Sequence, residues 1–184
     1  MLEQNEYSVN WEEEDITAQL IYFSEKSNFC FKWKINIFPE RKLYNKDIIF
    51  GNKSAKQARR IDMQMISWKN KEKENYYFEA KNLCEKDWIK NDGSNVSSSQ
   101  QLNRYINTGI EHSFTNYYPQ DGCLCGYIMQ GNLGNIISKL NFRLEKKSYN
   151  QLLLNNKPIN NYNQIYTIKK DNYSLLNIFF DFNK

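Results

Sequence analysis

Three charged residues, Asp62, Glu79 and Lys81, are the strongest candidates for chemistry in this sequence. Glu79 and Lys81 follow the strand-like run YYF and are two residues apart, so their side chains share one face of a strand. Asp62 lies in an earlier apolar run, between Ile61 and Met63. A carboxylate in such surroundings is costly without a metal ion or a basic partner, which marks all three residues as candidates for a site.

The chemistry that this set of residues allows is metal-assisted hydrolysis. Two carboxylates from neighbouring strands give a hard oxygen site that suits Mg²⁺, with Mn²⁺ as a substitute and the backbone carbonyl of Ala80 as a further ligand. Phosphodiester hydrolysis needs an activated water, charge neutralisation and help for the leaving group, all of which a bound Mg²⁺ can supply. Lys81 would orient or deprotonate the water and steady the phosphate oxygens.

The spacing of these residues resembles a known family. Asp62, seventeen positions before Glu79-Ala80-Lys81, is similar to the D-(x)n-ExK signature of the PD-(D/E)xK phosphodiesterases, although Ile61 stands where the family name has proline. The resemblance covers about two thirds of the chain, from Trp11 to Met129. It implies a restriction-endonuclease-like fold and a Mg²⁺-dependent endonuclease that cleaves DNA to leave a 5′-phosphate. It also suggests a role in bacterial restriction or anti-phage defence.

Two further elements support the resemblance. Gln101 and Tyr105, four residues apart on one helix face, resemble the QxxxY element of the RecB-like branch, in which that helix forms a wall of the active site. Glu13 resembles the acidic residue that the first helix of this fold turns toward the metal. Glu14 or Asp15 could hold that role instead.

The elements that must position these residues are predicted from periodicity and from turn-forming residues. The pattern favours an α/β or α+β fold, a mixed β-sheet core flanked by helices. The hydrophilic turn between the second and third strands favours an antiparallel hairpin, which would place Asp62 near Glu79. The expected helices are 11–23, 99–117 and 132–146. The expected strands are 29–38 (ended by Pro39), 60–68, 75–80, 123–129, 164–168 and 175–182, and the expected connections are 42–60 (with a short helical turn), 91–100 and 155–163.

The bulk composition limits the class of protein. A chain of 184 residues suits one domain, with 1–184 as a single nuclease-like unit. With 25 Lys and Arg against 21 Asp and Glu, the charge fits an anionic partner without requiring one. Four cysteines are too few for a disulfide scaffold, no signal peptide opens the chain, and no apolar run approaches the roughly 20 residues of a membrane span, so we expect a soluble, cytoplasmic protein. Cys123 and Cys125 are expected to be apolar strand residues rather than zinc ligands, and the single histidine, His112, lacks a catalytic partner.

The sequence leaves alternatives open. The chain could be a non-catalytic binding or assembly module that keeps the nuclease fold, or a nuclease directed at RNA. A chain of this length has little room for a separate recognition domain, so specificity or activation is expected from a homo-oligomer or a partner subunit. Replacing Asp62, Glu79 or Lys81 with alanine should abolish cleavage and leave the fold intact, since none is expected to contribute to the core.

Overall fold

The computed structural model describes residues 8, 10–69, 72–115, 117–118, 122–156, 165–170 and 173–182. The described helices are α1 (Glu13–Glu25), α2 (Asn28–Lys32), α3 (Lys46–Ile49), α4 (Ser98–Arg104), α5 (Glu111–Phe114) and α6 (Leu133–Lys146), with the 3-10 helices η1 (Ala55–Gln57) and η3 (Asn150–Leu152) and the π-helix η2 (Tyr105–Ile110). The described strands are β1 (Asn36–Leu43), β2 (Arg59–Lys69), β3 (Glu72–Cys84), β4 (Trp88–Ile89), β5 (Asn95–Val96), β6 (Gly122–Gln130), β7 (Asn155–Asn156), β8 (Ile165–Lys170) and β9 (Tyr173–Asp181).

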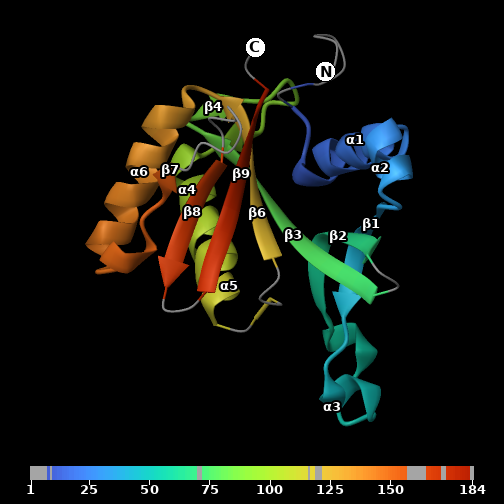
Figure 1. The fold of residues 1–184 in the computed structure, drawn as a ribbon. Helices are drawn as coiled ribbons and strands as arrows, with labels where there is room; N and C mark the ends of the chain where they lie inside the picture. Colours follow the sequence, from blue (N-terminus) through green and yellow to red (C-terminus); the bar gives the residue numbers. More distant parts are fainter. Residues whose placement is uncertain are drawn as a thin grey trace.

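Within this part of the chain, seven strands form one mixed sheet in the order β1-β2-β3-β6-β9-β8-β7 (Figure 1). β2 pairs antiparallel with both β1 and β3, whereas β6 pairs parallel with both β3 and β9. The remaining pairs, β9 with β8 and β8 with β7, are antiparallel. This arrangement confirms the coarser expectation of an α+β fold with a mixed sheet flanked by helices. No described helix has the length and apolar character needed to cross a membrane.

Two groups of buried side chains pack on the two faces of the sheet. One group joins Ile16 and Ile21 of α1 to Ala80, Cys123 and Cys125. The other joins the buried face of α4, η2 and α6 to β3, β6 and β9; it includes Leu83, Leu102, Ile106, Leu124, Ile136, Leu140 and Phe179. Because side chains alternate along a strand, Glu79 and Lys81 take the same side of β3 as Leu83, opposite Ala80. The two cysteines are buried apolar strand residues, as expected.

Gly126 on β6 makes room for the Phe179 side chain of its paired residue on β9. A Cβ atom built at this position would lie 2.4 Å from Cδ1 of Phe179, a side chain with no exposed surface. Any larger residue here would push the stacked pair of Phe179 and Tyr105 apart, so the glycine is required by packing.

The helices and the central hairpin lie close to the predicted ranges. α1 and α6 match 11–23 and 132–146, α4 through α5 matches 99–117, and β2 and β3 form the predicted antiparallel hairpin. The strands 123–129, 164–168 and 175–182 correspond to β6, β8 and β9, and the connection 42–60 carries α3 and η1. The expected loop 91–100 contains β5 and the start of α4. In 155–163, positions 155–156 form β7, and the rest lies outside the described residues.

The predicted strand 29–38 is wrong in its first half. Asn28 to Lys32 form α2, and Phe31 and Trp33, two residues of the alternating run within 29–38, are exposed. An alternating pattern indicates a strand only where a neighbouring strand pairs with it. The first described pair of β1 with β2 begins at Asn36, so the earlier residues have no such partner. Pro39 does not end the strand but lies inside β1, opposite Met63. β1 is an edge strand, where proline is tolerated because one side of its backbone needs no ladder hydrogen bond.

Candidate functional site

The structure brings Asp62, Glu79 and Lys81 together around the ammonium group of Lys81. Lys81 Nζ donates a 2.6 Å hydrogen bond to Glu79 Oε1 and another of 2.6 Å to the carbonyl oxygen of Ala80. The same nitrogen lies 3.9 Å from Asp62 Oδ2 and 3.7 Å from Glu13 Oε2. One buried ammonium therefore meets three carboxylates from α1, β2 and β3.

The register of the central hairpin explains why Asp62 reaches Glu79. The paired residues of β2 and β3 run as far as Met63 with Phe78, so Asp62 and Glu79 occupy the next position along the two strands. At this position a side chain accepts the backbone hydrogen bond in place of a backbone carbonyl: Asp62 Oδ2 accepts the Ala80 N–H at 2.6 Å. A hydrogen bond to an ionised oxygen is strong, so it fixes Asp62 against the backbone between Glu79 and Lys81.

Glu13 is the acidic residue of α1 that enters this cluster. Its Oε1 accepts the backbone N–H of Asn82 at 3.2 Å, and its Oε2 accepts from Nη2 of Arg104 at 3.2 Å. Asp15 is used elsewhere, because its side chain accepts the backbone N–H of Glu12 and completes the capping box of the helix. Of the three acidic residues considered from the sequence, only Glu13 has a recorded contact with Lys81.

Tyr105 is not part of the cluster. Its ring is fully buried and stacks on Phe179, and its hydroxyl donates a 2.8 Å hydrogen bond to Oδ1 of Asn177 on β9. This contact joins the helix to the sheet and gives Tyr105 a packing role, and it does not bring Tyr105 into the cluster around Lys81. The side-chain oxygen of Gln101 is buried and has no hydrogen-bond partner among the described residues. No recorded contact joins Gln101 to Asp62, Glu79 or Lys81.

Arg104 and Tyr118 join the site although the sequence analysis did not single them out. Arg104 follows Gln101 by one helical turn and reaches Glu13. Tyr118 is buried; desolvation, together with the negative charge of Glu79 and a hydrogen bond to it, raises the pKa of the Tyr118 hydroxyl, which therefore remains a donor. The position of Arg104 on the QxxxY helix could have suggested its role, whereas no local pattern marks Tyr118.

His112 has a packing role. Its ring stacks on Tyr117 at 4.1 Å between centroids, and desolvation lowers its pKa. The ring also meets Tyr118 edge-on, so His112 belongs to a small aromatic cluster.

The electrostatics of the cluster favour added positive charge. Burial first, and the neighbouring Glu79 second, raise the pKa of Asp62 from 3.8 to about 6, even though Lys81 and the Ala80 N–H act in the opposite direction. Burial would lower the pKa of Lys81, but Glu79, Glu13 and Asp62 outweigh it and raise that pKa. Asp62 is thus incompletely neutralised by the cations of the chain, while Lys81 is held firmly as an ammonium.

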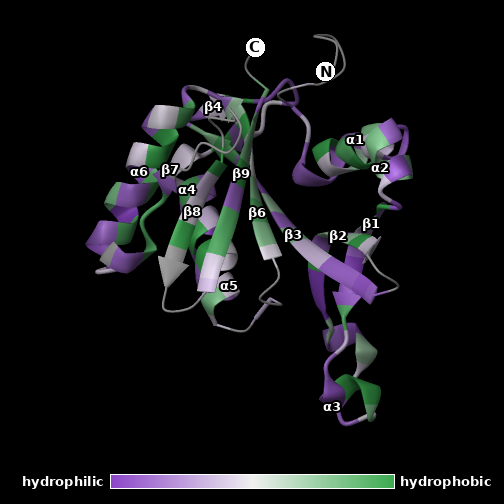
Figure 2. Cartoon of the chain, viewed as in Figure 1, coloured by the Kyte–Doolittle hydropathy of each residue, from purple (hydrophilic) through white to green (hydrophobic). Residues whose placement is uncertain are grey.

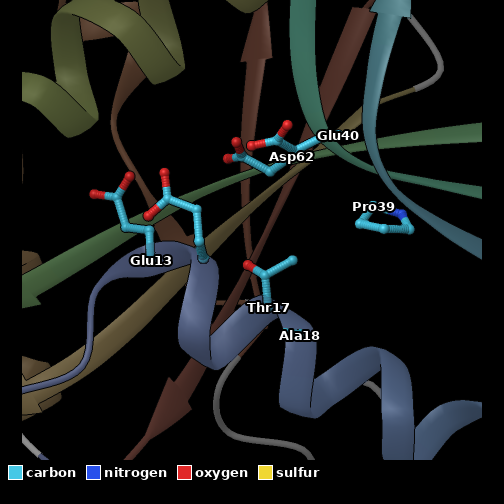
Figure 3. Close-up of a pocket in the computed structure, with 7 residues that line it drawn as sticks. Glu13, Thr17, Ala18, Pro39, Glu40 and Asp62 are labelled. Atoms are coloured by element: carbon cyan, nitrogen blue, oxygen red, sulfur yellow. The ribbon is translucent and has the colours of Figure 1, made fainter.

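A cavity of about 300 Å³ opens beside the cluster (Figure 3). In Figure 3, Glu13 and Thr17 rise from α1 on one side of it, and Glu40 and Asp62 lie on the other. Four of its lining side chains are acidic: Glu13, Glu14, Glu40 and Asp62. The cavity gives a cation access to Asp62 from solvent, and its charge repels a bare anion.

The donor atoms fit a hard divalent cation in kind. Carboxylate oxygens of Asp62 and Glu79 and the Ala80 carbonyl are the ligand types that Mg²⁺ prefers. Two of these three groups, however, already accept a hydrogen bond from Lys81, Glu79 through Oε1 and Ala80 through its carbonyl oxygen. Among the described residues, no group of three or more His, Cys, Asp or Glu side chains is arranged to hold a metal ion. A metal would therefore use these oxygens only after the Lys81 side chain moved away from them.

The sequence expectation that none of the three residues contributes to the core is wrong for two of them. Glu79 and Lys81 are both buried, and each satisfies the charge of the other. Removing Lys81 leaves buried carboxylates uncompensated, and removing Glu79 takes away the nearest partner of the ammonium, so these substitutions are expected to change stability as well as activity.

Comparisons of this chain with protein-family models, with curated proteins and with solved structures found no match.

Proposed function

We propose that this chain is a metal-dependent phosphodiesterase that cleaves DNA, with Asp62, Glu79 and Lys81 at its active site. The observation that carries the proposal is the convergence of three carboxylates on one buried ammonium at the end of the β2–β3 hairpin. Charged side chains are buried together at a cost in stability, and such clusters with perturbed pKa values gather at functional sites. The D-(x)n-ExK resemblance and the mixed sheet flanked by helices support the same assignment.

In this proposal, the residues of the chain divide the work. The Asp62 and Glu79 carboxylates and the Ala80 carbonyl would hold a Mg²⁺ ion, which when bound would activate water and neutralise charge on the phosphate. Lys81, displaced from Glu79, donates hydrogen bonds to a phosphate oxygen or to the attacking water. Because the pKa of Lys81 is raised, its ammonium acts as a hydrogen-bond donor that orients the attacking water. A carboxylate of the cluster then accepts the proton from that water.

Glu13 and Arg104 complete the arrangement from outside the metal site. Glu13 bridges the Asn82 N–H, Arg104 and Lys81, and so limits how far the ammonium can move when it leaves Glu79. Arg104 is exposed, and its remaining donors are available to a phosphate. The substrate backbone would approach along this side of α4.

A second candidate function is favoured by one observation. Lys81 already donates hydrogen bonds to Glu79 Oε1 and to the Ala80 carbonyl oxygen, so these two acceptors have a partner within the chain and need no metal ion. In that case the chain is a non-catalytic module of the same fold, whose buried ion pair has a structural role.

Plasmid cleavage together with metal-binding calorimetry distinguishes the two candidates. The nuclease nicks supercoiled DNA with Mg²⁺ or Mn²⁺, binds Mn²⁺ in calorimetry, and loses both properties in Glu79→Gln. Glu72→Gln, an exposed glutamate on the same strand, is the matched control and should behave like the unmodified chain. Absence of Mn²⁺ binding, or binding that is the same in Glu79→Gln, supports the module instead. A parallel digest of structured RNA separates a DNA-directed enzyme from an RNA-directed one.

A further inference from the structure

The positive charge of the chain is concentrated in one segment, residues 28–60, which we call the basic arm. It contains nine Lys and Arg and two Asp and Glu, whereas the rest of the chain contains 16 and 19. All nine cationic residues are exposed. The arm comprises α2, β1, α3, η1 and the first two residues of β2, and Figure 1 shows α2, β1 and α3 along one side of the molecule, away from α6. A surface of this charge attracts a polyanion, while the remainder of the protein repels one.

The basic arm also exposes aromatic rings. Phe31 is 88% exposed, Phe50 74% and Trp33 57%, and Phe29 and Tyr44 are exposed as well. Figure 2 shows hydrophobic residues interleaved with hydrophilic ones along α2, β1 and α3. Large apolar side chains that gather at the surface, rather than scatter singly, mark a site of interaction.

Cations and rings alternate within the arm at contact distance. Lys32 Nζ lies 5.9 Å from the centroid of the Trp33 ring, and the guanidinium carbon of Arg41 lies 5.4 Å from that of Phe38. The rings of Phe29 and Trp33 are 6.2 Å apart and tilted, so neither covers the other. Trp33 and Phe38 therefore each lie beside a positive charge, while Phe31 and Phe50 are the most exposed rings of the arm.

The candidate active site needs such a surface elsewhere on the molecule. The cavity beside Asp62 is lined by four carboxylates, so it contributes repulsion rather than affinity toward a phosphate backbone. The arm leads directly to it: Arg60 lies two residues before Asp62 on β2, roughly 7 Å along an extended strand. A strand bound on the arm would enter the cavity at Asp62.

We propose that the basic arm binds a single strand of DNA, with phosphates on its lysines and arginines and unpaired bases stacked on Phe31, Trp33 and Phe50. Stacking on exposed rings requires free base faces, which a duplex keeps inside its helix. A second copy of this chain is a poorer occupant, because a symmetric contact would place two strongly positive surfaces against each other. The choice of DNA rests on the proposed function.

Fluorescence anisotropy with a labelled oligothymidylate in EDTA tests the stacking contacts without cleavage. Phe31→Ala and Trp33→Ala should each weaken binding roughly tenfold, the loss typical of one base stack. The matched control is Phe142→Ala on α6, a 55% exposed ring outside the arm with Lys146 beside it at 4.4 Å, and its affinity should not change. Equal affinity in all three variants would overturn the proposal.

The charge contribution is tested by the dependence of binding on salt. Lys32→Gln combined with Lys34→Gln should reduce the slope of log K against log salt by about 1.4, or ~0.7 for each phosphate of a single strand that the arm no longer neutralises. Lys146→Gln is the control and should leave the slope unchanged. A duplex of the same length should bind more weakly than the single strand. Tighter binding of the duplex, or of an RNA strand, would overturn the choice of single-stranded DNA.

Failure of this inference can be distinguished from failure of the proposed function. If the arm variants bind normally while plasmid cleavage still requires Glu79, the enzyme assignment survives and the arm assignment fails. If the oligonucleotide binds through Phe31 and Trp33 but no metal supports cleavage, the arm assignment survives and the enzyme assignment fails. Light scattering excludes the second copy as occupant if the unmodified chain is monomeric. A dimer that Phe31→Ala dissociates with no loss of DNA binding would overturn the proposal.

Discussion

Lys81 Nζ and Glu79 Oε1 lie 2.6 Å apart, two residues from each other on one face of β3. Under the proposed function, this buried ion pair is the resting state of a site in which the chain supplies its own cation. A metal ion would compete with the ammonium for oxygens of Glu79 and Ala80, so metal binding would displace Lys81 and free its hydrogen-bond donors for a substrate. The pair thus connects the stability of the fold to the proposed chemistry.

Asp62→Asn is expected to stabilise the fold at neutral pH and to abolish cleavage. The pKa of Asp62 is raised from 3.8 to about 6 by burial and by Glu79, so the folded state binds this proton more tightly than the unfolded state. Its contribution to stability is full below pH 3.8 and is lost as pH rises through 6. Two pKa units correspond to about 3 kcal/mol, and the exposure of the side chain reduces the expected gain to about 1–2 kcal/mol.

The measurement is urea unfolding of both proteins at pH 5 and pH 8. The stability advantage of Asp62→Asn should be larger at pH 8, where Asp62 is ionised in the unmodified chain. The amide oxygen can still accept the Ala80 N–H, so the substitution isolates the charge. A variant less stable than the parent at pH 8 would show that the carboxylate is not under electrostatic stress.

Lys81→Met is expected to destabilise the fold and to make it more responsive to Mg²⁺. Without the ammonium, Glu79, Glu13 and Asp62 repel one another in a buried setting, at a cost of about 3 kcal/mol in EDTA at pH 8. Mg²⁺ should then recover part of the loss, because it no longer competes with Lys81 for Glu79 and the Ala80 carbonyl. Thermal unfolding with and without MgCl₂ measures both effects.

The matched control for this substitution is Lys73→Met, an exposed lysine on the same strand. Its melting temperature and its response to MgCl₂ should equal those of the unmodified chain. If MgCl₂ raises the melting temperature of Lys81→Met no more than that of the control, the ammonium and the metal do not share a site.

Local patterns predicted the centre of the site because the interacting residues lie on one hairpin. The two-residue period placed Glu79 and Lys81 on one face, and the turn between β2 and β3 brought Asp62 alongside. The same reasoning failed for Phe31 and Trp33, since an alternating pattern does not reveal whether a neighbouring strand exists to pair with it.

Contacts between distant segments lay beyond what local patterns reveal. Tyr105 meets Asn177 on a strand 72 residues later, and Tyr118 meets Glu79 from the segment before β6. Both depend on the order of strands in the sheet, in which β6 lies between β3 and β9, an arrangement that the periodicity of single segments does not encode. The helix that carries Tyr105 was correctly placed, but its partner could not be.

Glu13→Gln is expected to reduce cleavage by about tenfold to 100-fold, the range for residues that position an active-site group from outside. Glutamine can still accept the Asn82 N–H but removes the charge that holds Lys81 and Arg104. Asp15→Asn is the control, because Asp15 bonds only the backbone of Glu12 among its recorded contacts and should leave the rate unchanged. Rates on supercoiled plasmid in Mg²⁺ compare the two. Equal rates would remove Glu13 from the site.

Tyr105→Phe separates a packing role from a catalytic one. The hydroxyl donates to Asn177, which is fully buried, so its removal leaves Oδ1 of Asn177 without this donor and should lower the free energy of unfolding by about 1–3 kcal/mol. The cleavage rate of the folded protein should remain within about twofold, since no recorded contact joins Tyr105 to the cluster. Urea unfolding and plasmid cleavage measure the two quantities.

A double-mutant cycle with Asn177→Val identifies the contact responsible. If the hydroxyl acts only through Asn177, the second substitution should restore part of the stability lost in Tyr105→Phe, because the orphaned amide is gone. The phenyl ring still stacks on Phe179, so the core itself is unchanged. A variant that keeps its stability but loses cleavage would return Tyr105 to the wall of the active site, where the QxxxY resemblance had placed it.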